Sequence, residues 1–96
     1  MFKHIFIALT LTASSAVFAE TNQIDLKLNA TYKEAFKMLG EPLQKSQRAW
    51  LKFRDLDCNA QLPNFGTSPY MADNFQNCID QHNLIRIKQL EAMQSA

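Results

Sequence analysis

The sequence predicts an all-α protein: a small bundle or hairpin of about three helices, closed by one disulfide. Apolar residues recur at helical spacing in three stretches of the 96-residue chain. No alternation of apolar and polar residues persists for more than a few positions, so strands are not predicted. The two glycines and three prolines lie at or between the ends of the helical stretches. A chain of this length holds one domain.

The first two helical stretches meet at Gly40. The first is expected to begin near Asp25, a plausible N-cap, and Gly40 suits the position just beyond its end. Its apolar positions are Leu28, Tyr32, Ala35, Phe36 and Leu39. Pro42 fits the first turn of a second helix that runs to about Cys58. Its apolar side is marked by Leu43, Trp50, Phe53 and Leu56. Two separate helices and one kinked rod both fit this pattern.

A loop is expected from residue 59 to residue 68, because it contains Pro63 and Gly66. Ser68 and Pro69 form a suitable N-cap and first-turn pair for a long third helix. One stripe of that helix carries Met71, Phe75, Cys78, His82, Ile85 and Met93, and Ile79 and Leu90 widen it.

Residues 1–19 have the pattern of a signal peptide: a basic start, a short apolar run and small residues before Ala19. A buried N-terminal helix or a membrane anchor would be the alternatives, but the run is shorter than the roughly 20 residues that span a bilayer. Residues 20–96 would then form a single periplasmic domain without stable membrane insertion. Without Lys3, nine basic residues face nine acidic ones, which argues against nucleic-acid and anionic-membrane binding.

The two cysteines of an exported chain have one intramolecular pairing, Cys58 with Cys78. Closing a loop of about 20 residues should stabilise the fold by roughly 3 kcal/mol. The pairing fixes a register between the second and third helices, in which Trp50 should lie near Arg86. The wide spacing of the cysteines and a single mature histidine argue against a zinc site.

The sequence carries no pattern for catalysis, a metal or another cofactor. Both cysteines are committed to the disulfide, so a cysteine nucleophile is excluded on this interpretation. Asp55 and Asp57, two residues apart on a helix, point away from each other. His82 falls on the apolar stripe and is interpreted as an interior or boundary residue. The protein is therefore not expected to be an enzyme.

The sequence resembles the LprI-like lysozyme-inhibitor N-terminal domain family of bacterial exported proteins. The resemblance covers nearly all of residues 20–96. It is carried by Leu28, Asn29 and Tyr32, the block 47–58 (QRAWLKFRDLDC), Gly66, Cys78, Arg86 and Leu90. It implies a small helical, disulfide-bonded fold and the inhibition of lysozyme by protein–protein contact. An immunity protein against a cell-wall-targeting toxin and a structural or stress-related envelope protein are the alternatives.

The expected roles of the remaining residues divide into structural and partner-binding. Trp50 and Phe53 are expected to anchor the core, while Arg54, Asp55 and Arg86 are expected to form helix-surface or helix–helix pairs. A partner is expected to contact the loop between Leu62 and Tyr70, because loops carry partner-specific contacts. Its expected binding residues are Phe65, Thr67, Ser68 and Tyr70.

Overall fold

The computed structural model describes residues 23–95, and every long element within them is a helix. The chain is helical over residues 23–39, then in α2 (Glu41–Ala60) and in α3 (Tyr70–Gln94), with a short 3-10 turn, η1 (Leu62–Asn64), before α3. This confirms the all-α prediction. The expected signal peptide lies outside the described residues. None of the described helices is both long and apolar enough to cross a membrane.

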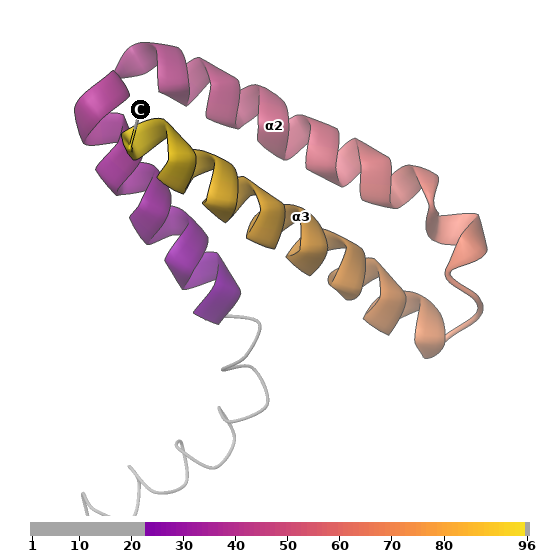
Figure 1. Ribbon diagram of the computed structural model, residues 1–96. Coiled ribbons are helices and arrows are strands. Elements are labelled where there is room, and N and C mark those ends of the chain that lie inside the picture. Colours follow the sequence, from indigo (N-terminus) through magenta and orange to yellow (C-terminus); the bar gives the residue numbers. More distant parts are fainter. Residues whose placement is uncertain (1–22, 96) are drawn as a thin grey trace, which may run out of the picture.

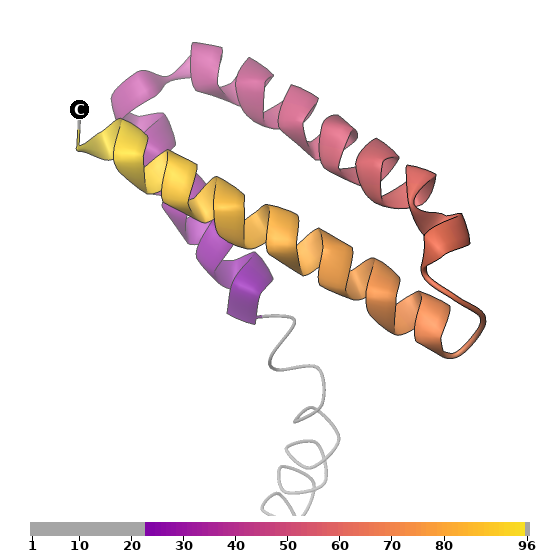
Figure 2. The same ribbon diagram turned by 45° about the vertical axis from the view of Figure 1, so that its right-hand side comes forward.

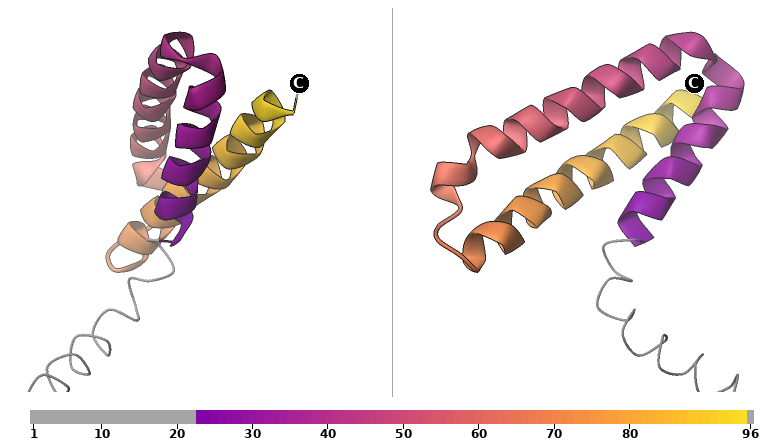
Figure 3. Two further views of the ribbon diagram at one scale, coloured as in Figure 1. Left: turned by 90° about the vertical axis from the view of Figure 1, so that its left-hand side faces the viewer. Right: turned by 180° about the vertical axis from the view of Figure 1, so that it is seen from behind.

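The three helices run up, down and up. The helix of residues 23–39 leads to a corner at Gly40, α2 leads away from it, and α3 returns towards it (Figure 1). The views agree that α3 lies beside α2 and also crosses the first helix (Figures 2 and 3). Side-chain hydrogen bonds join α3 to both other helices, which supports this arrangement. The third helix is therefore the one that ties the molecule together.

The corner consists of one glycine. Gly40 has φ 70° and ψ −149°, a conformation that is essentially restricted to glycine. Its N–H donates to the carbonyl oxygen of Phe36 at 2.8 Å, which closes the first helix. Pro42 sits in the first turn of α2. Of the two possibilities that the sequence left open, two separate helices is the correct one.

The apolar core occupies the half of the molecule nearest the corner. Its buried members are Leu28, Ala35, Leu43, Ile87 and Leu90, and Ile24, Tyr32, Trp50 and Met93 pack against them. The other half of the α2–α3 pair is joined by the Cys58–Cys78 disulfide, with the two Cα atoms 5.8 Å apart. This confirms the predicted pairing. The disulfide therefore lies beyond the end of the apolar core.

In this distal half, several residues that were expected to be buried are exposed. Phe53, expected in the core, has 55% of its surface exposed, and Leu56, Met71 and Ile85 are exposed as well. The physical reason is the position of the first helix. It covers α3 only from the corner to about the level of Asn83, and it turns the buried face of α3 towards Asn83, Arg86, Ile87 and Leu90. Two helices alone cannot bury apolar side chains on their outer faces.

Two expected N-caps are also wrong. Asp25 lies inside the first helix, where its carboxylate bonds to another helix instead of capping its own. The third helix begins at Tyr70, after a cis Ser68–Pro69 peptide, and no side chain caps it. The N–H of Met71 instead donates to the carbonyl oxygen of Thr67. The second helix continues past Cys58 to Ala60, so the true loop is shorter than expected.

Candidate protein-binding site

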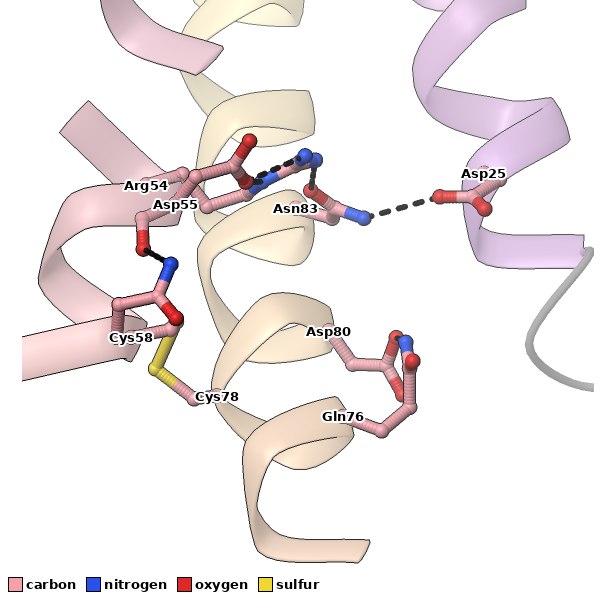
Figure 4. A network of polar contacts seen from close by, with 9 residues as sticks. Asp25, Arg54, Asp55, Cys58, Gln76, Cys78, Asp80 and Asn83 are labelled. Carbon is pink, nitrogen blue, oxygen red and sulfur yellow. Dashed lines mark hydrogen bonds and ion pairs between the residues drawn. A yellow bond between two sulfur atoms is a disulfide. The ribbon is translucent and has the colours of Figure 1, made fainter. Parts of the chain in front are cut away.

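A buried amide joins all three helices. Asn83 on α3 is fully buried, and its Nδ2 donates to Oδ1 of Asp25 on the first helix at 3.1 Å. Its Oδ1 accepts from Nη1 of Arg54 on α2 at 3.0 Å (Figure 4). Arg54 also pairs with Asp55, with 2.8 Å between Nη2 and Oδ1. Through Asn83, these hydrogen bonds connect the first helix, α2 and α3.

A second buried polar group, Arg86, lies closer to the corner. Its side chain is only 6% exposed and donates to neutral acceptors: Gln47 Oε1 at 2.9 Å, Ser46 Oγ at 3.2 Å and Gln89 Oε1 at 3.2 Å. Burial lowers the pKa of the guanidinium, which nevertheless stays protonated at physiological pH. The geometry fits a side chain that holds α2 and α3 together.

Two guanidinium groups lie near the ring of Trp50. The Cζ atom of Arg86 is 5.6 Å from the centre of the Trp50 ring, and the Cζ atom of Arg54 is 5.5 Å from it. The proximity of Trp50 and Arg86 follows from the register that the disulfide imposes, and it confirms that expectation. Trp50 is half-buried against the core and surrounded by internal partners, so little of it is left for an outside partner.

At the distal end of the α2–α3 pair, several apolar side chains face outwards. Phe53 on α2 and Ile85 on α3 are each 55% exposed. The ring of Phe53 meets that of His82 edge-on, with 5.5 Å between the ring centres. A groove of about 460 Å³ lies beside His82, lined by Phe65, Ile85, Cys78 and a set of amide side chains: Gln61, Asn64, Asn74, Asn77 and Gln81. We call Phe53, Phe65, His82 and Ile85 the distal apolar surface.

Short polar contacts fix the shape of this surface. Nε2 of His82 lies 2.7 Å from Oδ2 of Asp57, and Nε2 of Gln61 donates to the same carboxylate oxygen at 3.3 Å. The amide of Asn74 donates to the carbonyl oxygen of Phe65 at 2.9 Å, which ties the loop to α3. Together with the disulfide, these bonds pre-form the groove, so a partner would meet an ordered surface.

The structure places the four loop residues named from the sequence in two different settings. Phe65 is half-buried and lines the groove. Thr67, Ser68 and Tyr70 are exposed and do not line it, and Tyr70 is 69% exposed. Sequence reasoning missed Ile85 and the outward position of Phe53, because both fall at helical core spacing and no local pattern tells a covered face from an uncovered one.

The two cysteines of the chain lie at this end. Their two sulfurs are bonded to each other, so neither is a nucleophile in this state. Both sulfurs and one ring nitrogen of His82 lie within 4.8 Å of one another. In residues 23–95 this is the one group of three or more His, Cys, Asp or Glu side chains close enough to hold a metal ion. The spacing argument from the sequence did not foresee that the fold brings these three residues together.

Comparison with known proteins places the chain in a family. A relative from Escherichia coli (strain K12), "Uncharacterized protein YecT", is 30% identical over 96 aligned positions, which cover 80% of this chain and 59% of the relative. The chain thus spans somewhat more than half the length of that relative. No protein of solved structure shows significant similarity. The sequence pattern of one family, described as lysozyme inhibitor LprI, matches residues 9–90, and the chain therefore belongs to the lysozyme inhibitor LprI family.

Proposed function

We propose that this protein is an exported, periplasmic inhibitor that binds a lysozyme-type muramidase through the distal apolar surface. Membership of an inhibitor family supports a protein partner and a role other than catalysis. The observation that carries the proposal is the exposure of Phe53, whose ring meets that of His82, and of Ile85, which lines the groove beside His82. Clustered exposed apolar side chains on a small protein mark interaction sites.

The distal apolar surface has the composition of an interface centre. Aromatic side chains are enriched among the residues that dominate binding energy, and they act best where they are desolvated on contact. The amide side chains around the groove supply hydrogen-bonding groups at its edge. In this arrangement Phe65 is an anchor, and Thr67, Ser68 and Tyr70 belong to the polar rim of the interface.

The oxidised cysteine pair and the apolar leader support export. Disulfides persist in oxidising compartments such as the bacterial periplasm. The signal peptide, residues 1–19, would be removed there, leaving residues 20–96 as the mature inhibitor. This location would also give the protein access to lysozymes that reach the cell wall.

The test measures cell-wall lysis by lysozymes of several classes in the presence of the purified protein. We expect inhibition of at least one class at micromolar concentration. Ile85→Ser and Phe53→Ser should weaken that inhibition at least about fivefold, since truncation of an interface anchor costs more than about 1 kcal/mol. Leu26→Ser is the matched control, because Leu26 is 66% exposed and belongs to the first helix, which contributes no residue to the distal apolar surface.

Two results would contradict different parts of the proposal. If no lysozyme class is inhibited at micromolar concentration, the inhibitor function is wrong. If inhibition is observed and Leu26→Ser weakens it as much as Ile85→Ser does, the function stands but the distal apolar surface is not the binding site. Circular dichroism of each variant establishes that the helices are retained.

A further inference from the structure

We propose that, once the disulfide is reduced, Cys58, Cys78 and His82 form a binding site for zinc or a similar thiophilic divalent cation. Both sulfurs and one ring nitrogen of His82 already lie within 4.8 Å of one another. Thiolate sulfur and imidazole nitrogen are the ligands that zinc prefers in proteins. The inference concerns the reduced protein and is independent of the proposed inhibition.

The backbone places the three ligands without rearrangement of the helices. Cys78 and His82 are four residues apart on α3, so their side chains lie on the same face one turn apart. Cys58 lies in the last turn of α2, with its Cα 5.8 Å from that of Cys78. Zinc–sulfur bonds of about 2.3 Å in a tetrahedral site put two sulfurs roughly 3.8 Å apart. Rotation of the two cysteine side chains is enough to open the sulfurs to that distance.

The surroundings of His82 match the usual support of a metal-bound histidine. Such a histidine almost always donates its other ring N–H to a carboxylate, a carbonyl or water. Here Oδ2 of Asp57 lies 2.7 Å from Nε2 of His82. When Nε2 carries the hydrogen, Nδ1 keeps the lone pair that a metal requires, and the metal is assigned to Nδ1. Gln61 holds the carboxylate in turn, through its Nε2 at 3.3 Å from Oδ2.

The chemistry needs an external reductant. A dithiol gives two electrons and two protons to the Cys58–Cys78 bond, which becomes two thiols, while the dithiol is oxidised to its own disulfide. Zinc then replaces the two thiol protons, which pass to solvent, and neutral His82 supplies the third ligand. Two thiolates and one imidazole leave a fourth position for water. The metal would thus cross-link α2 and α3 at the place that the disulfide occupies.

The test titrates Zn²⁺ into the purified protein after anaerobic reduction by a phosphine, in competition with a chromophoric chelator. We expect one zinc per reduced chain and no matching site in the oxidised protein. His82→Ala should weaken zinc binding at least about tenfold, and Asp57→Asn about 10- to 100-fold, the usual effect of removing a group that supports a ligand. Asp55→Asn is the matched control, since Asp55 pairs with Arg54 instead and should leave affinity unchanged.

A second measurement separates a formed site from two cysteines on an unfolded chain. Circular dichroism of the reduced protein should show helicity rising to the oxidised level on addition of one equivalent of Zn²⁺, and this rise should be absent in Cys58→Ser. The proposal is overturned if the reduced protein takes up no stoichiometric zinc. It is also overturned if His82→Ala binds zinc as tightly as the parent chain.

Discussion

Asn83 is the residue at which all three helices are connected by hydrogen bonds. Its single amide group donates to Asp25 and accepts from Arg54, one bond to each neighbouring helix. Because the side chain is fully buried, neither of its polar atoms has water as an alternative partner. The amide therefore contributes to stability and also fixes how the first helix sits against the α2–α3 pair.

Replacing this amide by an apolar group of similar shape should destabilise the fold. Asn83→Leu removes both hydrogen bonds and leaves Nη1 of Arg54 without its acceptor, so we expect a loss of roughly 1–3 kcal/mol in the free energy of unfolding. Urea unfolding measures this change. The control is Asn77→Leu, an exposed position on the same helix that should change stability by no more than about 0.5 kcal/mol. Equal losses in the two variants would contradict the role assigned to Asn83.

The candidate site was only partly predictable at this scale. The position of Trp50 beside Arg86 followed from one disulfide and the constant rise of antiparallel helices. Asn83 was not predicted, because an isolated amide at a buried position leaves no periodic pattern. His82 was correctly placed at a boundary, but its pairing with Asp57 depends on the rotation of α2 about its axis, which spacing alone does not fix.

At the scale of elements, Gly40 determines the path of the chain. It separates two helices that would otherwise continue into each other, and it turns α2 back along the bundle. A Cβ at this position would meet no atom within 4 Å, so the need for glycine comes from the backbone conformation alone. This distinguishes Gly40 from glycines that permit close packing.

Gly40→Ala should therefore cost about 1–3 kcal/mol in the free energy of unfolding, the usual strain of an L-residue in this region of φ and ψ. Urea unfolding of the purified variant measures the loss. A D-alanine at the same position, introduced by chemical synthesis of residues 20–96, is the control. It favours positive φ, so it should be tolerated. Similar destabilisation by both alanines would point to side-chain crowding and contradict the backbone explanation.

The corner between the first helix and α2 was more predictable than the faces of the helices. Gly40 and Pro42 are local signals, and the structure uses both where the sequence placed them. The faces were misjudged where the deciding fact is tertiary. Ile85 fits a core stripe by spacing, yet it is exposed because the first helix packs on the other side of α3. No window of the sequence contains that information.

At the scale of the whole molecule, the protein is held in two different ways along its length. Near the corner, three helices bury an apolar cluster that includes Leu43, Ile87 and Leu90. Towards η1 only α2 and α3 remain, and the Cys58–Cys78 bond and the Asp57–His82 contact join them. Because this part of the molecule is held without an apolar core of its own, Phe53 and Ile85 can remain exposed.

Removing the Cys58–Cys78 disulfide should therefore destabilise the distal half more than the half near the corner. The disulfide spans 20 residues, and closing a loop of that size stabilises a fold by about 3 kcal/mol. The Cys58→Ser, Cys78→Ser double variant should lose about that much and show a lower melting temperature. Amide hydrogen exchange should rise most in the last turns of α2 and the first turns of α3, while the amides of Leu43, Ile87 and Leu90 keep more of their protection.

The pattern of exchange distinguishes this division from a uniform fold. If the bond merely restricted the unfolded chain, every amide that exchanges by global unfolding would lose protection equally, and the corner would open together with the distal end. If instead the disulfide is the main contact that holds the distal half together, amides in the distal half should exchange faster than amides near the corner. The groove beside Phe65 would then unfold before the apolar core. The proposed inhibition, measured with the double variant, should then fall more steeply with temperature than the variant's helix content does. Parallel loss of both would show that the distal apolar surface shares the stability of the apolar core.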